Sequence, residues 1–272
     1  MAFAKLKSTF STWDASSSQP LPDNDIIMDH ISHKFDQHLA QLHSKLGELG
    51  SLVVSTMNAI PLFSSQIPQD QVQGHDCNTR LQHAEAQIHA VFLLEAQIDE
   101  ECERIIALYQ PVASDLRTVI AVIRTLSEIQ AIANSLEQMI KLIGRAQHQR
   151  SPTAWDQFVS LGSQTAILTG LAIRSIMQII AKSDLHQGET LMKQYRITKK
   201  SYRRLQKTLD ATEIHADQTL AYGFRLAQEF LHIIKHNKLM IGHLIYLIEG
   251  TDVRHLSFKQ MRDMLELSLD HD

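Results

Sequence analysis

The sequence has little glycine and little proline, with 10 and 6 residues among 272. Because these residues end helices and form most tight turns, their scarcity argues against a fold of many short strands joined by turns. Leucine, isoleucine, alanine and glutamine are frequent instead, and hydrophobic residues recur at steps of three and four, which is the period of one helix face. The sequence therefore predicts an all-α protein built from long helices.

The sequence also has few cysteines and no excess of positive charge. The two cysteines, Cys77 and Cys102, have no motif spacing and are expected to be reduced thiols in a cytoplasmic protein. The net charge of −4 gives no general attraction to nucleic acid, so no nucleic-acid partner is expected. The most apolar window, residues 165–181, contains Arg174 and Gln178 and is shorter than the roughly 20 apolar residues of a membrane span, which predicts a buried helix.

Enzyme signatures are missing as well. The sequence contains no phosphate-binding loop, no Gly-x-Ser-x-Gly, no His-Glu-x-x-His and no paired cysteines. Ser114 and Asp115 are adjacent, but Asp115 stands where it can stabilise the beginning of a helix through the helix dipole. We therefore expect a protein that is not an enzyme, with no catalytic residue and no cofactor.

Proline, glycine and serine divide the chain into segments. Residues 1–23 are Ser-rich and predict a disordered tail. Pro111 is expected in the first turn of a third helix, Gly250 just beyond the end of a sixth, and Ser257 at the start of a short last helix. We predict two tandem three-helix bundles and a short C-terminal helix, with boundaries at residues 24–150, 151–255 and 256–272.

Two stretches, residues 101–117 and 245–255, resemble the PhoU family of phosphate-uptake regulators. The first resembles the junction of that family's second and third helices, and the second resembles the end of its sixth helix. The positions that carry the resemblance are Gln110, Pro111, Asp115, Arg117, Tyr246, Gly250, Asp252 and Arg254. Both stretches fall where a six-helix arrangement requires them, and the resemblance covers residues 31–255.

The resemblance implies a cytoplasmic, non-enzymatic adaptor built as two three-helix bundles. Its implied partners are the ATPase of a phosphate ABC transporter and a phosphate-responsive sensor histidine kinase, with membrane contact at most peripheral and through a transporter. A homodimer is left open. Two alternatives also remain open: a diverged adaptor for another transporter or kinase, and a metal-binding protein that uses surface histidines.

Many PhoU proteins bind metal clusters through a Glu or Asp followed four residues later by an Asp, on the third and sixth helices. Carboxylates at this spacing lie on one helix face, where they can hold hard cations. Counted from the two motif stretches, the matching positions hold Gln130, Asn134, Leu231 and Lys235. None is a carboxylate, and Glu128 and Glu229 are each displaced by two residues, so no metal cluster is expected.

His232 and His236 have the i, i+4 spacing of a helical transition-metal site, although two separate histidines are the favoured interpretation. A second candidate is a run of cations in residues 193–207. It consists of Lys193, Arg196, Lys199, Lys200, Arg203, Arg204 and Lys207, with Tyr195 and Tyr202 between them. The favoured interpretation is a solvated helix face; the alternative is a surface that binds an acidic partner helix or phospholipid headgroups.

Overall fold

The computed structural model describes residues 24–60, 75–146, 152–182, 188–211, 218–257, 259–261 and 263–264. The predicted disordered tail, residues 1–23, lies outside the described residues, as does the side chain of Cys77. The chain divides into two compact units, Met1–Gln37 and His38–Asp272. The first contributes only the beginning of one helix to the described part, and the second contains everything discussed below.

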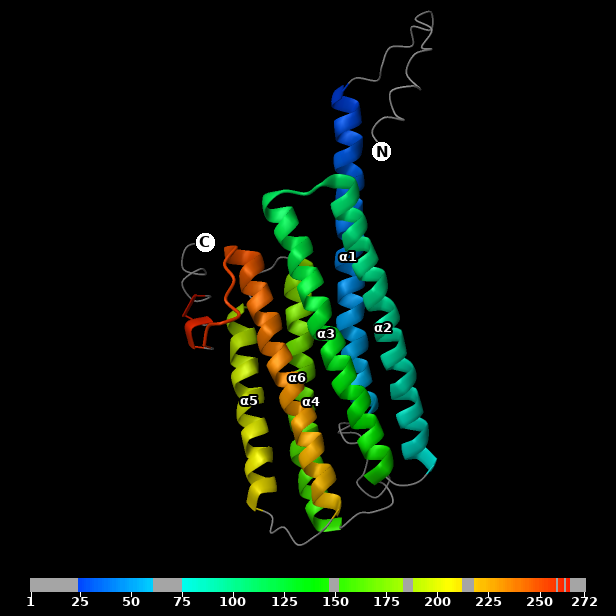
Figure 1. The fold of residues 1–272 in the computed structure, drawn as a ribbon, viewed down its shortest axis with the longest axis vertical. Helices are drawn as coiled ribbons and strands as arrows, with labels where there is room; N and C mark the ends of the chain where they lie inside the picture. The colour runs from blue at the N-terminus through cyan, green and yellow to red at the C-terminus, as the bar shows by residue number, and fades with distance from the viewer. Residues whose placement is uncertain are drawn as a thin grey trace, which may run out of the picture. The chain divides into compact units, whose positions relative to one another are not determined.

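Six long helices make up the structure, and its described residues contain no strand (Figure 1). In chain order they are α1 (Asn24–Ala59), α2 (His75–Tyr109), α3 (Ala113–Ala146), α4 (Pro152–Lys182), α5 (Gly188–Ala211) and α6 (Gln218–Glu249). The all-α prediction is confirmed. No proline lies within these helices except Pro152 at the first position of α4, so no helix is interrupted by a residue that lacks a backbone N–H.

Within the unit His38–Asp272 the helices form two tandem three-helix bundles, as predicted. Helix α3 packs against α2 on one side and against α6 on the other, and α6 also packs against α4 and α5 (Figure 1). The contact between α3 and α6 thus joins the two halves. Leu126 and Ile129 of α3 and Phe230 and Ile233 of α6 are completely or almost completely buried. Apolar burial of this kind is the main stabilising term for such bundles. The domain boundaries remain a prediction.

A second contact between the halves brings α1 close to α4. Gly50 of α1 lies where an added Cβ would be 2.8 Å from the Cβ of Met177, and Gly170 of α4 lies against Val54. The absence of a side chain at Gly50 and Gly170 allows close approach of the two helix backbones.

Cys102 of α2 is a free, buried thiol. Burial, followed by the nearby charges of Asp99 and Glu101, raises its pKa to about 12.

The link between α2 and α3 differs from the prediction. Pro111 does not lie in the first turn of α3, which begins two residues later at Ala113. Gln110 and Ala113 both have positive φ, at 47° and 49°. Two left-handed residues so close together reverse the chain and are incompatible with a continuous helix. The Gln110 N–H still donates to the carbonyl of Ile106 at 3.1 Å, which ends α2.

The end of α6 matches the prediction closely. Gly250 has a φ of 69°, and its N–H donates to the carbonyl of Tyr246 at 2.9 Å, which is the geometry of a glycine just beyond a helix end. Ser257 and Gln260 then form a capping box: the Ser257 N–H donates to Gln260 Oε1 at 2.9 Å and the Gln260 N–H to Ser257 Oγ at 3.4 Å. Residues 259–261 and 263–264 are helical, which confirms the short C-terminal helix.

By length and composition, α3 is the single helix of the described chain that could cross a membrane. More than half of its apolar window is buried within the protein. A helix in contact with α2 and α6 is expected to be apolar for that reason alone. The window at residues 165–181 belongs to α4, where Ile173, Ile176 and Ile180 are buried, as predicted.

Candidate functional site at the contact of α3 and α6

The two motif stretches meet in space. Arg117 of α3 lies so close to Gly250 that a Cβ there would be 2.7 Å from Nη1 of the arginine. Arg124, two turns further along α3, places its guanidinium 4.5 Å from the centre of the Tyr246 ring, and its Nη1 is 4.0 Å from Oδ2 of Asp252. We call these five residues, together with Arg254, the tail junction. It connects the beginning of α3 to the segment that follows α6.

Asp252 and Arg254 fix the conformation of this segment. Arg254 Nη2 donates to Asp252 Oδ2 at 2.6 Å, Nε donates to Oδ1 at 3.0 Å, and the Arg254 backbone N–H donates to Oδ1 at 3.1 Å. These hydrogen bonds, with the nearby positive charges, hold the pKa of Asp252 well below its usual range. Asp252 is therefore a permanent anion facing Arg124. Because the pair is exposed, it orders the segment more than it stabilises the fold.

One turn beyond Arg124, α3 carries a carboxylate that binds two histidines of α6. His236 Nδ1–H donates to Glu128 Oε2 at 2.6 Å, and His243 Nε2–H donates to Glu128 Oε1 at 3.2 Å. The two histidines are seven residues apart, so they lie two turns apart on one face of α6. The side chain of His243 is only 3% exposed and that of Glu128 14%. We call these three residues the Glu128 cluster.

The ionisation of Glu128 follows from its partners. Burial by itself raises the pKa of this carboxyl, but hydrogen bonds from His236 and His243 and their positive charge outweigh burial and lower the pKa to about 2. Glu128 is therefore ionised at neutral pH. A partly buried anion with both oxygens hydrogen-bonded is a fixed point between α3 and α6, because losing either contact would leave a partly desolvated charge without a partner.

The geometry of the Glu128 cluster is that of direct hydrogen bonds. Each histidine nitrogen lies within hydrogen-bonding distance of its carboxylate oxygen, at 2.6 Å for His236 and 3.2 Å for His243. Across the described part of the chain, no group of three or more His, Cys, Asp or Glu side chains is arranged to hold a metal ion. The metal-free state of the protein remains a prediction.

The four predicted metal-motif positions lie on two neighbouring helices, α3 and α6. Gln130 and Asn134 lie exposed on α3, whereas Leu231 and Lys235 line a pocket between α5 and α6. The two histidines of the i, i+4 pair also have different partners. His232 Nδ1 lies 3.6 Å from Glu229 Oε2, whereas His236 binds Glu128.

Neither His243 nor the role of Glu128 is among the sequence-based predictions. A signal was present: His243 stands among buried apolar positions of α6, seven residues after His236. A histidine on a buried helix face needs a hydrogen-bond partner, and so does a carboxylate on the buried side of α3. Only the fold, however, could show that Glu128 binds His236 and His243, which follow it in the sequence by 108 and 115 positions.

The sequence of this chain is similar to those of known proteins over nearly the whole length of both. The chain is 25% identical over 240 residues to the phosphate-specific transport system accessory protein PhoU of Serratia marcescens, which covers 87% of this chain and 93% of that protein. It is 26% identical over 250 residues to the PhoU homolog of Pseudomonas aeruginosa, covering 90% and 97%. No family model matches the chain.

Comparison of the fold with solved structures also finds PhoU proteins. The crystal structure of the phosphate transport system regulatory protein PhoU from Streptococcus pneumoniae superposes with a TM-score of 0.64 over 80% of this chain and 99% of that one, at 18% identity. The chain is similar to PhoU proteins along almost their whole length and shares their fold. The resemblance to PhoU proteins is thereby confirmed, and the tail junction is where the chain brings the two motif stretches together.

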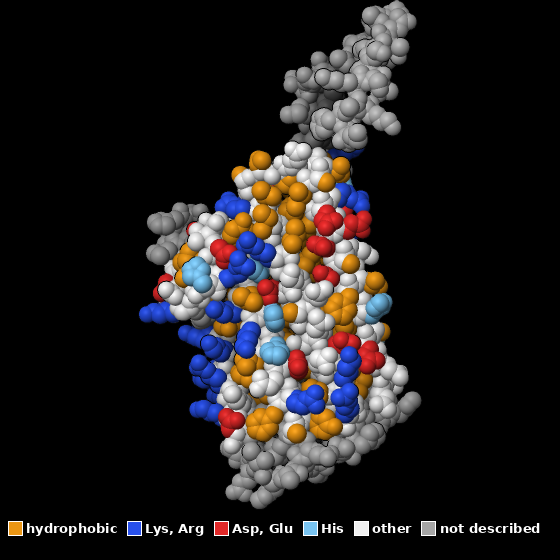
Figure 2. Space-filling model, in the orientation of Figure 1, with side chains coloured by type: hydrophobic (Ala, Val, Ile, Leu, Met, Phe, Trp, Pro, Cys, Tyr) orange, Lys and Arg blue, Asp and Glu red, His pale blue; other side chains and the backbone are white. Residues whose placement is uncertain are grey.

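The seven predicted basic residues all lie on α5 and all are exposed. Figure 2 shows lysine and arginine gathered along the left edge of the molecule, over α5. The opposite face of this helix is buried, with Leu191, Thr198 and Leu205 packed inside. Helix α5 is therefore strongly amphipathic, with a cationic outer face that covers one side of the second bundle.

Proposed function

We propose that this protein is a non-enzymatic accessory protein of phosphate transport that acts in the cytoplasm. In this proposal it binds the ATPase of a phosphate ABC transporter and a phosphate-responsive histidine kinase and modulates both. The observation that carries the proposal is the extent of the similarity, because 93% and 97% of two phosphate-specific transport accessory proteins are matched. No large part of those relatives lacks a counterpart in this chain.

The exposed face of α5 is the surface that we assign to a partner. It presents Lys193, Arg196, Lys199, Lys200, Arg203, Arg204 and Lys207 in a chain whose net charge is −4. Clustered charge of one sign steers a complementary partner and fixes its orientation. An acidic surface on the transporter ATPase or the kinase would fit it. The tail junction and the Glu128 cluster would then hold the two bundles in a fixed arrangement while the partner is bound.

A binding measurement tests the partner assignment. We expect the purified chain to bind the purified phosphate-transporter ATPase of its own source with a dissociation constant that rises steeply with salt. The triple variant Arg196→Gln, Lys200→Gln, Lys207→Gln should weaken binding by about tenfold or more, because it removes three exposed cations that pair with nothing in the described chain. Biolayer interferometry at two salt concentrations measures both effects.

The matched control removes three exposed cations elsewhere. Lys141→Gln, Arg145→Gln, Arg225→Gln changes the net charge equally on α3 and α6 and should leave affinity within about twofold. Equal loss in both triple variants would reject α5 as the binding surface. Failure of the unaltered chain to bind the ATPase, while it binds a different transporter's ATPase, would favour the alternative of a diverged adaptor.

A further inference from the structure

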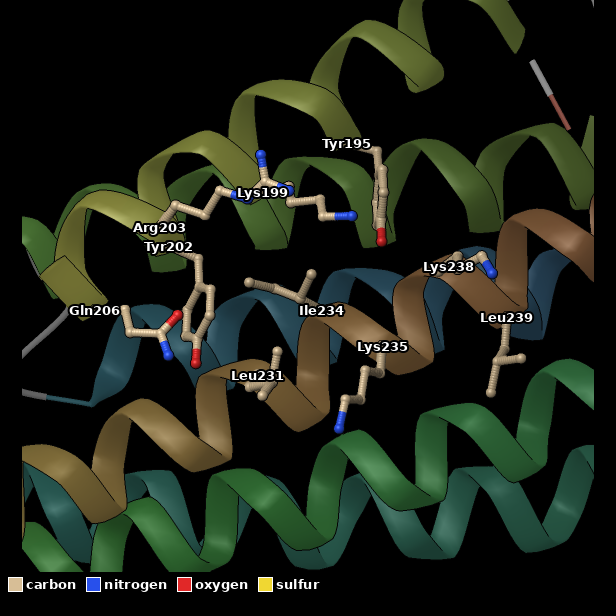
Figure 3. Close-up of a pocket in the computed structure, with 10 residues that line it drawn as sticks. All are labelled: Tyr195, Lys199, Tyr202, Arg203, Gln206, Leu231, Ile234, Lys235, Lys238 and Leu239. Atoms are coloured by element: carbon tan, nitrogen blue, oxygen red, sulfur yellow. The ribbon is translucent and has the colours of Figure 1, made fainter. Parts of the chain in front are cut away.

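A groove with a cavity volume of about 510 Å³ runs between α5 and α6 (Figure 3). Four cations line it: Lys199 and Arg203 belong to α5, and Lys235 and Lys238 belong to α6. The residues within each pair are four or three positions apart, so each pair lies along one helix face over about one turn. The sequence pattern revealed only the α5 half of this arrangement.

Little neutralises this charge. None of the described residues that line the groove is acidic. Within the described part of the chain, Lys199, Arg203 and Lys235 form no hydrogen bond or ion pair. Lys238 Nζ donates to the carbonyl of Leu256 at 3.0 Å, which holds this amine at the groove. Four cations brought together without counter-charge repel one another, and a bound anion would remove that repulsion.

The inside of the groove is apolar and aromatic. Leu231 and Ile234 of α6 lie between the two rows of cations, and Tyr195 and Tyr202 of α5 extend their rings from the opposite wall with the hydroxyl groups toward α6 (Figure 3). Both tyrosines are buried, and burial raises the pKa of the Tyr195 phenol, so it remains a neutral O–H donor. The groove therefore offers apolar and aromatic contact together with positive charge.

We propose that this groove binds an organic phosphate of nucleotide size. The apolar or aromatic body of the ligand lies on Leu231 and Ile234, and its phosphate groups lie between the α5 and α6 cations. Arginine and lysine are the side chains that bind phosphate oxygens best, and Arg203 can do so with two parallel hydrogen bonds. The groove shares Lys199 and Arg203 with the partner surface on α5. ATP binding and ATPase binding are measured separately, so either proposal can fail without the other.

Size and shape decide between this ligand class and simpler anions. A volume of about 510 Å³ falls within the range of roughly 300 to 1,000 Å³ that holds small organic ligands. Inorganic phosphate would leave most of that space unfilled and would not reach both the cations and the apolar residues. A flat array of lipid headgroups would contact the exposed outer cations but not the recessed Leu231 and Ile234.

Isothermal titration with ATP, and in parallel with tripolyphosphate and inorganic phosphate, tests the proposal on the full chain. We expect saturable ATP binding with a dissociation constant on the order of 10 µM, with tripolyphosphate at least about tenfold weaker because it has no body to lie on the apolar residues. Lys199→Gln with Lys235→Gln should weaken ATP binding about tenfold or more. Lys200→Gln with Lys207→Gln removes the same charge outside the groove and should leave it within about twofold.

Several results would overturn the proposal. Absence of saturable ATP binding at millimolar concentration, with the helical circular dichroism intact, would do so. Equal affinity for tripolyphosphate and ATP would show an inorganic-anion site instead. Equal loss in both double variants would show general electrostatic attraction. Sedimentation with phosphatidylglycerol vesicles that depends on Lys199 and Lys235, without ATP binding, would assign the groove to a lipid headgroup, and an acidic peptide that binds there while ATP does not would assign it to a protein partner.

Discussion

Replacing Glu128 by glutamine should lower the free energy of unfolding by about 2 kcal/mol at pH 6. Glutamine keeps the shape of the side chain, but it has one acceptor oxygen where His236 and His243 each donate to a separate carboxylate oxygen. Lowering a carboxyl pKa from 4.5 to about 2 corresponds to about 3 kcal/mol, and water at this partly exposed group reduces that to about 2 kcal/mol. Urea denaturation measures the difference.

The effect of this substitution should depend on pH in a defined direction. The pKa of Glu128 is lower in the folded protein than the ordinary 4.5, so its stabilising contribution is fully present above about pH 4.5 and is lost as pH falls toward 2. The difference between the unaltered chain and Glu128→Gln should therefore shrink between pH 5 and pH 3. Comparing the two proteins at each pH cancels the titration of all other carboxyls.

Glu137 supplies the control on the same helix. It pairs with Lys141 at 2.8 Å one turn away, and both side chains are exposed. Such pairs contribute little, so Glu137→Gln should change the free energy of unfolding by less than about 0.5 kcal/mol at any of these pH values. An equally small effect for Glu128→Gln, or one that stays constant from pH 6 to pH 3, would contradict the role assigned to the Glu128 cluster.

Two glycines three residues apart in α1 should respond to alanine in opposite directions. Gly50→Ala places a Cβ 2.8 Å from Met177 Cβ and 2.9 Å from Cγ, and a Cβ cannot move without its backbone. The gain in helix propensity, about 1 kcal/mol, is outweighed by overpacking, and we expect a net loss of about 1 to 2 kcal/mol. Gly47→Ala meets no heavy atom within 4 Å and should raise stability by about 0.5 to 1 kcal/mol.

Thermal and urea unfolding of the two glycine variants check this pair. Each is a single methyl addition in the same helix, so each serves as the control for the other, and any general effect of alanine cancels. If both variants were stabilised, α1 would not approach α4 as closely as the contact of Gly50 with Met177 requires. If both were destabilised, glycine would have a role at position 47 that the structure does not show.

Local sequence signals predicted the helices well. Residues such as Gly250 and Ser257 act within one turn of themselves, so their effect on the chain can be read without knowing the fold. The α2–α3 link was mispredicted because Pro111 is compatible with a first helical turn. What excludes it are the left-handed conformations of Gln110 and Ala113, which local sequence does not dictate.

The site was less accessible from sequence, because its contacts join residues far apart. Counting from the two motif stretches places the metal motif at positions 130 and 134 of α3. By that count Glu128 is two residues away from a ligand position, and its actual role is not visible. Its partners, His236 and His243, lie on α6, and Lys235, assigned to the same motif, lines the groove between α5 and α6. Likewise the cations of α5 were visible as a run, but the two lysines of α6 that complete the groove join them only through packing.

Metal content tests most directly the claim that this chain joins α3 to α6 through the Glu128 cluster and without metal ions. Elemental analysis of the purified protein should find far less than one iron, zinc or manganese ion per chain, because Gln130, Asn134, Leu231 and Lys235 supply no negative charge. Chelator should change neither the free energy of unfolding nor ATPase binding. A ratio near one metal ion per chain, lost when His232 and His236 are changed to alanine, would contradict the account.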